Sequence, residues 1–327
     1  MGSHLLLQLI LTEDRIRAMK RESSNISILN LLCDHYNIDT KLLRKIEWVN
    51  GDLEDVTGLN EICEDVEVVY HCAAMVSFNP YDAKELIKVN EEGTANLVNV
   101  ANQVGVKRLC HVSSTAAIGQ AGGNYETTED DAWMVGDPHS AYSISKFNAE
   151  REVKRAAEEG LNIVIVNPSI IIGPGVLGKS SSAMFSYALK EIGFYSLGAN
   201  GFVDARDVAR AMIQLSKSDI QKDRFLVTGG NHTFREVLEK ISEVLHVKKP
   251  IYVAGPFLSK IIYWIEKIRS FLTGSRPLLT KEMITSSNLI VSYSNQKIKK
   301  AIGFGFTSVD DSIENTGKYY LRHFKKT

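Results

Sequence analysis

The chain has 327 residues, 44% of them hydrophobic, and its 38 basic residues nearly balance its 39 acidic ones. This length and composition predict a soluble globular protein with one large α/β unit or two modest domains. The balanced charge, without a long run of one sign, excludes the electrostatic footprint of a nucleic-acid-binding protein. No apolar run is long enough to span a membrane and the first residues lack the layout of a signal peptide, so we expect a cytoplasmic protein with no integral membrane segment.

Metal-binding patterns are missing from the sequence. The four cysteines show no C-x-x-C spacing, and the eight histidines include no H-E-x-x-H pair. These spacings are typical of zinc sites. We therefore expect no metal, and we interpret the cysteines as buried thiols in a reducing compartment; they are Cys33, Cys63, Cys72 and Cys110.

Short apolar strands alternate with helices over the first part of the chain. The leucine-rich run at 5–11 predicts a buried helix that starts almost at the first residue. Strands are expected over 15–21, 46–49, 66–71, 108–112 and 162–166, and helices over 28–36, 41–45, from Pro80 through Val100, and from Tyr142 to about Gly160. This alternation is the signature of βαβ units, so the predicted fold is α/β, a doubly wound parallel sheet of Rossmann type.

The alternation weakens after Gly175, where we expect helices over 180–190, 205–216, 233–245 and 257–272, with strands over 202–204 and 225–227. The helix at 257–272 is amphipathic. Packing of this helix on the core as a lid is favoured over attachment to a membrane surface.

A tyrosine and a lysine with helical spacing form a candidate acid/base pair. Tyr142 and Lys146 lie four residues apart on an expected helix, so both side chains point into the same space. A neighbouring ammonium group favours the charged form of a phenol, and Lys146 is therefore expected to lower the pKa of Tyr142. Ser114, at the end of a strand, would hold the same substrate oxygen. Because Y-x-x-x-K pairs are also common on solvated helices, that alternative stays open for the pair alone.

Ligands of doubly wound sheets bind at the carboxyl ends of the strands, where several short motifs fall. They are Gly51-Asp52-Leu53, His71-Cys72-Ala73-Ala74, Val89-Asn90-x-x-Gly93-Thr94-x-Asn96-Leu97, Val112-Ser113-Ser114, Tyr142-x-x-x-Lys146 and Asn167-Pro168-Ser169-x-x-x-Gly173-Pro174-Gly175. In order and spacing this set resembles the extended short-chain dehydrogenase/reductases, the NAD-dependent epimerase/dehydratase type. Val76-Ser77-Phe78 is similar to the branch of the 3β-hydroxysteroid dehydrogenases and dihydroflavonol reductases.

The resemblance implies an enzyme that uses NAD or NADP to transfer a hydride to or from a small carbonyl or secondary alcohol. Tyr142 would be the general acid/base, Lys146 would lower its pKa and hold the nicotinamide ribose, and Ser114 would orient the substrate oxygen. Asn90 would support the site from the long central helix. A purely structural role for Asn90, bridging backbone groups, stays open.

Further residues would bind the cofactor if the resemblance holds. Asp52 and Leu53 would flank the adenine, Ala73 and Ala74 would line the cofactor through their backbone, and Pro168 and Ser169 would lie near the nicotinamide. Asp52 could equally end a strand in a turn. An acid after the second strand binds the ribose 2′-hydroxyl of NAD, whereas cations there suit the 2′-phosphate of NADP. Lys20 and Arg21 therefore favour NADP over NAD, with a solvated strand end as the alternative.

Three hypotheses about function remain open, and the first is the oxidoreductase described above. Family members that dehydrate nucleotide sugars carry two acids after the serine position, where this chain has Thr115 and Ala116, so dehydration is disfavoured. Nucleotide-sugar epimerisation needs no such acids and is the second reading. A non-catalytic family member that lacks a cofactor is the third.

The resemblance covers most of the chain up to about residue 210 and implies two regions. An NAD(P)-binding core would span 1–173, with 202–230 returning to it. A smaller C-terminal substrate-capping region would comprise 174–201 and 231–327. Family members often form dimers through two helices, one of them the tyrosine-bearing helix, so a homodimer is implied beside a small-molecule substrate.

The start of the chain departs from the family pattern. Members begin with an apolar strand and a G-x-x-G-x-x-G turn whose amides receive the cofactor pyrophosphate. Gly2 matches only the last of these glycines. Because the first strand is central in the 3-2-1-4-5-6 order, its loss opens a gap two strand spacings wide. Our hypothesis is that the native product carries roughly ten more residues at its N-terminus; without them we expect weak or absent cofactor binding.

Overall fold

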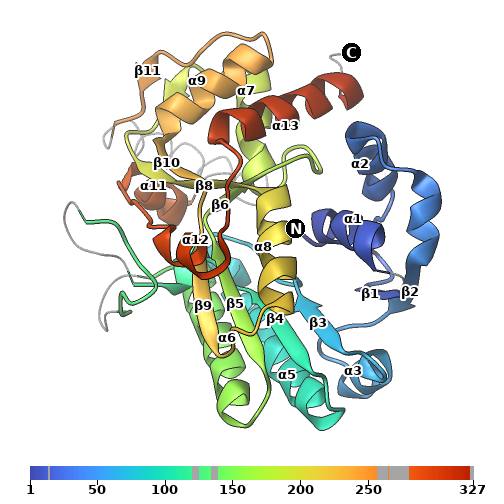
Figure 1. Cartoon of the computed structure of the whole chain (residues 1–327). Helices are drawn as coiled ribbons and strands as arrows, with labels where there is room; N and C mark the ends of the chain where they lie inside the picture. The colour runs from blue at the N-terminus through green and yellow to red at the C-terminus, as the bar shows by residue number, and fades with distance from the viewer. Residues whose placement is uncertain (14, 120–124, 134–138, 256–263, 265–279, 325–327) are drawn as a thin grey trace.

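The computed structural model describes residues 1–13, 15–119, 125–133, 139–255, 264 and 280–324. A parallel sheet with helices on both faces forms its larger part (Figure 1). Its four neighbouring strands are, in order, β3 (Val68–His71), β4 (Arg108–Val112), β5 (Ile163–Pro168) and β9 (Asp223–Val227). The predicted Rossmann-type α/β class is confirmed.

Helices cover both faces of this sheet. On one face α5 (Gly93–Gln103) and α6 (Ala141–Glu158) pack side by side, and α3 (Val56–Cys63) contacts α5. On the other face α8 (Ala205–Lys217) packs against β4 and β5. Every residue of β4 and β5 is buried, as expected for strands covered on both sides.

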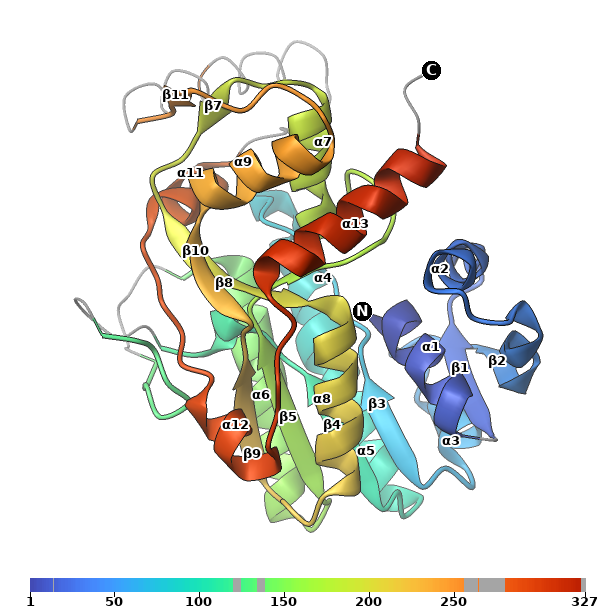
Figure 2. The ribbon, with the colours of Figure 1, turned by 45° about the horizontal axis from the view of Figure 1, so that its top comes forward.

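A second parallel pair lies beside the main sheet without joining it. β1 (Ile16–Lys20) pairs with β2 (Ile46–Asn50), and in the described residues no strand ladder links β1 to β3. Figure 2 shows β1 and β3 as the facing edges of the two groups. Val68 and Tyr70 of β3 are only half-buried, unlike the residues of β4. The sheet is therefore interrupted between β1 and β3 in the described part of the chain.

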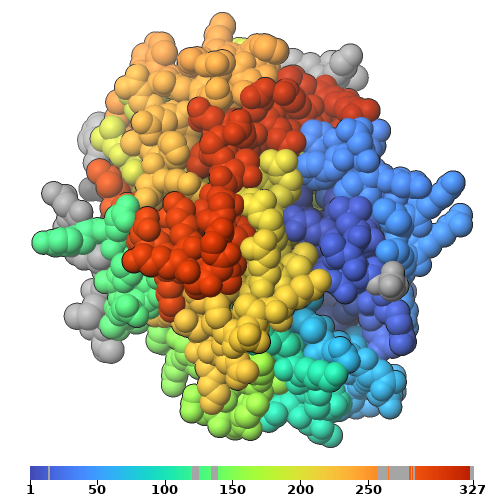
Figure 3. Space-filling model, in the orientation of Figure 1, coloured from blue at the N-terminus to red at the C-terminus, as the bar shows by residue number. Residues whose placement is uncertain are grey.

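Side chains rather than backbone hydrogen bonds hold the two groups of strands together. α1 (Gly2–Thr12) is the buried helix predicted at the start of the chain, and it packs against α8 and α2 (Ile28–Tyr36). Its buried residues Leu5, Leu7 and Leu9 share one apolar cluster with Ala18 of β1 and Val164 of β5. In the space-filling view the segment from α1 to β2 lies against α8 and α13 (Val309–His323) (Figure 3).

Short strands and helices form a smaller region above the carboxyl ends of the main sheet (Figure 2). One sheet has the order β10-β8-β6, in which β6 runs parallel and β10 antiparallel to β8, and β7 pairs with β11. The bounds of these strands are β6 Ile170–Ile172, β7 Phe194–Tyr195, β8 Ala199–Asp204, β10 Gly230–Thr233 and β11 Tyr252–Val253. The helices of this region are α7 (Ala183–Leu189), α9 (Phe234–Val244) and α11 (Lys281–Asn288), with α13 packed on α9. Helix α12 (Gln296–Ile302) instead packs against β9 of the main sheet.

The observed elements agree with some of the expected bounds and differ from others. The bounds of α2 and β4 are those expected, whereas the helix expected from Pro80 is irregular. It begins as a 3₁₀ turn and continues as α4 (Ala83–Leu86), a π-helical stretch (Ile87–Glu92) and then α5. The amphipathic helix expected over 257–272 lies outside the described residues. Within the described part of the chain, no helix is both long and apolar enough to cross a membrane.

Candidate active site

Helix α6 brings Tyr142 and Lys146 to the carboxyl end of β4. Ser140 caps this helix, because its Oγ accepts a hydrogen bond from the Ser143 backbone amide at 3.0 Å. The cap fixes where the first turn begins, and Tyr142 lies in that turn. The side chain of Ser114 lies near the Tyr142 hydroxyl, close enough to lower the pKa of that phenol. The structure thus brings together the two hydroxyl groups that the sequence analysis selected.

Ser114 is held in place from two sides. Its Oγ accepts a hydrogen bond from the Ala116 amide at 3.1 Å, which starts a 3₁₀ turn over Thr115–Ala117. Its backbone carbonyl accepts a hydrogen bond from Asn167 Nδ2 at 3.0 Å. The hydroxyl therefore sits at a defined point just beyond β4, where it can meet a substrate oxygen.

The Tyr142 phenol titrates in the direction opposite to the one expected. Burial raises the pKa of Tyr142, and the nearby Ser114 side chain opposes that rise. The expected lowering of this pKa by Lys146 is wrong for the arrangement seen here. The reason is that the Lys146 ammonium group donates a hydrogen bond to the Val112 carbonyl, 2.8 Å away, instead of facing the phenol.

Lys146 is buried with only 2% of its surface exposed. Burial lowers the pKa of Lys146 to about 8, while the negative charge of Glu150, followed by Cys72, works against this decrease. The ammonium group is therefore close to its titration point at physiological pH. A buried cation with a single backbone partner is well placed to interact with a ligand hydroxyl.

Asn90 lies in the π-helical stretch and is 1% exposed. Its amide bridges the Met75 backbone, accepting from the Met75 N–H at 2.7 Å and donating to the Met75 carbonyl at 2.9 Å. It also donates to Ser145 Oγ at 2.9 Å, and that hydroxyl donates to the Tyr142 carbonyl at 2.8 Å. Asn90 thus ties the loop after β3 to α6, which is the bridging role left open by the sequence.

Three of the predicted cofactor residues lie around the gap between β1 and β3. Gly2 begins α1 beside the end of β3, since a Cβ added to it would lie 3.9 Å from the Cys72 Cβ. Ala73 and Ala74 follow β3 and are exposed, so their backbone is open to a ligand. These features fit a dinucleotide lying across the strand ends.

The other predicted cofactor residues have mixed surroundings. Arg21 directly follows β1 and is exposed. Asp52 accepts a hydrogen bond from the Glu54 amide at 3.1 Å, as in the strand-end turn left open by the sequence. Leu53 is 5% exposed, and its carbonyl accepts from Asn96 Nδ2 at 2.9 Å.

The last pair of predicted cofactor residues lies at the end of β5. Pro168 is the final residue of that strand, and Ser169 follows it. Ser169 Oγ donates to Thr228 Oγ1 at 3.1 Å. Both residues are buried, so they can only form the floor of a site at this position.

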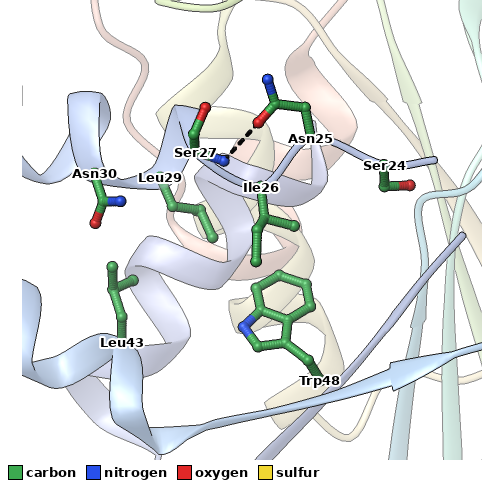
Figure 4. Close-up of a pocket in the computed structure, with 8 residues that line it drawn as sticks. All are labelled: Ser24, Asn25, Ile26, Ser27, Leu29, Asn30, Leu43 and Trp48. Carbon is green, nitrogen blue, oxygen red and sulfur yellow. Dashed lines mark hydrogen bonds between the residues drawn. The ribbon is translucent and has the colours of Figure 1, made fainter. Parts of the chain in front are cut away.

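A shallow pocket next to the loop after β1 contains none of the predicted site residues (Figure 4). Trp48, Leu43 and Ile26 form its apolar side. Asn25 lies on its rim, where its Oδ1 accepts a hydrogen bond from the Ser27 amide at 2.9 Å. The predicted site residues therefore lie outside this pocket.

Comparison with known proteins identifies the family. The model of the NAD dependent epimerase/dehydratase family matches residues 1–227. The chain belongs to this family. Sterol demethylase protein B of Methylococcus capsulatus is 30% identical over 262 residues, which cover 79% of this chain and 75% of that protein. The putative dihydroflavonol 4-reductase of Synechocystis is 26% identical over 328 residues, covering 98% and 92%.

The fold of this epimerase/dehydratase family member also matches solved structures. A double mutant of the dTDP-glucose 4,6-dehydratase from Streptomyces venezuelae, with NAD bound, superposes with a TM-score of 0.77 at 18% identity, covering 98% of this chain and 94% of that one. The resemblance drawn from the motifs, including the dihydroflavonol reductase branch, is confirmed.

The sequence analysis missed a buried carboxylate beside the candidate site of this family member. Glu150, buried on α6, accepts hydrogen bonds from Ser113 Oγ at 2.9 Å and from Asn167 Nδ2 at 2.8 Å. Arg224 of β9 donates to the same carboxylate at 2.9 Å. The available signal was the spacing, because Glu150 follows Lys146 by four residues and so shares its face of α6.

Buried histidines predict that this family member loses stability in acid. Burial lowers the pKa of His4 to about 4, that of His71 to about 3, and that of His111 well below its ordinary value of 6.5. Below pH 6.5 the unfolded chain therefore binds protons that the folded chain does not. The free energy of unfolding is expected to be unaffected by these groups above about pH 6.5 and to fall as the pH drops, by about 1.4 kcal/mol per pH unit for each histidine.

Urea denaturation at pH 7.5 and 5 measures this loss. His111→Leu is the informative variant, because both ring nitrogens of His111 lack a hydrogen-bond partner among the described residues and the change leaves no group unpaired. It should flatten the pH dependence, whereas His232→Leu, at a half-buried strand position, is the control that should leave it as in the parent. An unchanged slope in His111→Leu would refute the prediction.

Proposed function

We propose that this protein is an NAD(P)-dependent oxidoreductase that transfers a hydride to or from a small carbonyl or secondary alcohol. The observation that carries the proposal is the proximity of the Tyr142 and Ser114 hydroxyls at the carboxyl end of β4, with the buried Lys146 one helical turn away at the Val112 carbonyl. This is the edge of a doubly wound sheet at which ligands bind. The family assignment supports an enzyme that uses a nicotinamide cofactor.

Each of the three side chains has a separate role in carbonyl reduction or alcohol oxidation. Tyr142 Oη donates a proton to the substrate oxygen during reduction and removes it during oxidation. Ser114 Oγ donates a second hydrogen bond to that oxygen and fixes its position. Lys146, one helical turn from Tyr142, would donate a hydrogen bond to a hydroxyl group of the bound cofactor and so hold the cofactor beside the reacting oxygen. The bound nicotinamide supplies or accepts the hydride.

The surroundings of Tyr142 favour an apolar or amphipathic substrate. The Phe78 ring meets the Tyr142 ring edge-on, with centroids 5.7 Å apart. Val76, in the same loop, leaves 50% of its side chain exposed. An apolar substrate would cover such groups on binding.

We propose NADP as the preferred cofactor, with Arg21 as the residue that selects it. Lys20, the other cation at this strand end, is hydrogen-bonded to Asn50 Oδ1 at 2.8 Å, whereas the guanidinium group of the exposed Arg21 has no hydrogen-bond partner among the described residues and can meet a 2′-phosphate. We expect the parent to bind NADPH more tightly than NADH. Arg21→Asp should shift the ratio of the two Kd values toward NADH by about tenfold or more.

Fluorescence titration with both cofactors, followed by a turnover screen against carbonyl compounds, tests the proposal. Arg15→Asp is the matched control, since Arg15 is an exposed arginine just before β1, away from its carboxyl end. A Kd ratio that Arg21→Asp leaves unchanged would refute the assignment of Arg21. Interconversion of nucleotide sugars without net consumption of NADPH would favour an epimerase instead.

A further inference from the structure

We propose that Glu150 is a positioning residue for the proposed reaction: its carboxylate locks α6 to the ends of β4 and β5 and so fixes Ser114 relative to Tyr142 and Lys146. The inference rests on the proposed function, because it takes these three side chains as the reacting groups. Glu150 itself reaches none of the reacting atoms and acts through Ser113 and Asn167.

The Glu150 carboxylate is saturated with donors although it is 2% exposed. Oε2 accepts from Ser113 Oγ at 2.9 Å and from Asn167 Nδ2 at 2.8 Å. Oε1 accepts from Arg224 at 2.9 Å and pairs with Lys154 Nζ at 2.8 Å. Two oxygens therefore join four partners from α6, β4, β5 and β9, which is the full accepting capacity of a carboxylate.

The hydrogen bonds of Glu150 are linked to Ser114 through Asn167 and Ser113. The Asn167 amino group that donates to Glu150 also donates to the Ser114 carbonyl, at 3.0 Å. Ser113, the residue before it, is fixed by Glu150 through its hydroxyl and by Val166 through its backbone amide, which donates to the Val166 carbonyl at 2.8 Å. The peptide unit that carries the Ser114 hydroxyl is thus held at both ends by groups that the Glu150 carboxylate orients.

The Glu150 carboxylate also supplies a negative charge near the Lys146 ammonium group. Lys146 is faced by Glu150 from α6, by Cys72 and His71 from the end of β3, and by His111 from β4. Both histidines are neutral because burial lowers their pKa. Glu150 is ionised: burial works to raise its pKa, but Lys154, Arg224 and Asn167 together hold it below its ordinary value.

Removal of the Glu150 charge is expected to lower the pKa of Lys146. Without the Glu150 carboxylate, Lys154 and Arg224 remain as cations without their partner. The pKa of Lys146, which burial lowers to about 8 and which Glu150 raises, then falls further. A smaller fraction of Lys146 carries its proton at neutral pH, and activity that needs the charged form is lost at lower pH than in the parent.

Glu150→Gln tests the proposal, because glutamine has the same shape without the charge. We expect a kcat lower by a factor on the order of ten to a hundred. We also expect NADPH affinity close to that of the parent, and an alkaline limb of the kcat profile displaced to lower pH. Glu150→Asp restores the negative charge, but its shorter side chain cannot reach Ser113 and Asn167. The alkaline limb of the kcat profile of this variant should therefore return to the parent position while kcat stays low. Glu152→Gln, two residues further along α6, is the matched control with parent behaviour.

The outcomes separate this proposal from the proposed function. If Tyr142→Phe is inactive while Glu150→Gln keeps both the kcat and the pH profile of the parent, the role of Glu150 is overturned and the proposed function stands. If Tyr142→Phe is fully active, the proposed function fails. Should Glu150→Gln not fold, Glu150→Asp decides, since a parent-like kcat in that variant would overturn the positioning role.

Discussion

An extended strand inserted between β1 and β3 is expected to raise the affinity of this protein for NADPH by on the order of a hundredfold, about 2.7 kcal/mol. The two strands present facing edges that no ladder joins in the described residues. Parallel neighbours lie about 4.8 Å apart, so a strand that bonds to both edges completes the sheet. The turn that follows such a strand would lie at Gly2, where α1 begins beside Cys72.

The affinity should rise because the turn supplies backbone amides for the pyrophosphate. A helix N-terminus preceded by a glycine-rich turn offers several converging N–H groups, and the helix dipole favours a negative ligand. Stability should rise as well, because each new ladder hydrogen bond contributes about 0.5–1.5 kcal/mol. The half-buried residues Val68 and Tyr70 of β3 would also become covered.

A variant with an apolar strand of about five residues and a Gly-x-x-Gly turn fused ahead of Met1 makes the test. The control carries the same extension with proline at the two central strand positions, because proline cannot donate to a ladder. NADPH titration and urea denaturation compare the three proteins. Equal Kd values for the extended protein and its proline control would contradict the prediction.

The fold was predictable because its strongest signals are local. Strands β4 and β5 are buried and mostly apolar runs, and α2 carries an apolar face, so their presence follows from composition and period. The bounds of β4 and α2 were those expected, whereas β5 begins one residue later and ends two residues later than the predicted 162–166. Strands of two or three residues, such as β6 and β7, are too short to show a period. They exist because neighbouring backbone pairs with them, which is a tertiary effect.

The candidate site was predictable in its residues but not in its electrostatics. The spacing of Tyr142 and Lys146 on one helix places them together whatever surrounds them. The pKa of Tyr142 depends on burial and on the direction in which the Lys146 ammonium group points, and these are set by packing around α6. The role of Glu150 likewise depends on partners from β4, β5 and β9 that are distant in sequence.

Replacing Tyr142 by phenylalanine is expected to reduce kcat by about a thousandfold while NADPH binding stays within about twofold of the parent, because loss of a general acid/base typically costs a hundredfold to ten-thousandfold. The change removes one oxygen and leaves the ring packed edge-on against Phe78. Ser114 keeps the hydrogen bonds from Ala116 and Asn167 that hold it, so the rest of the site remains in place.

Tyr81→Phe is the matched control for Tyr142→Phe, since Tyr81 is 87% exposed and its loss of a hydroxyl should leave kcat unchanged. Both variants are best made in the protein extended by the apolar strand as well as in the parent, so that the chemical step is compared at two cofactor affinities. Full turnover by Tyr142→Phe would remove Tyr142 from the mechanism. Absence of turnover in the extended parent itself, with NADPH bound, would instead favour a family member that binds the cofactor without catalysis. In that case the Ser114, Tyr142 and Lys146 side chains and the cofactor would all be present, and no reaction would follow.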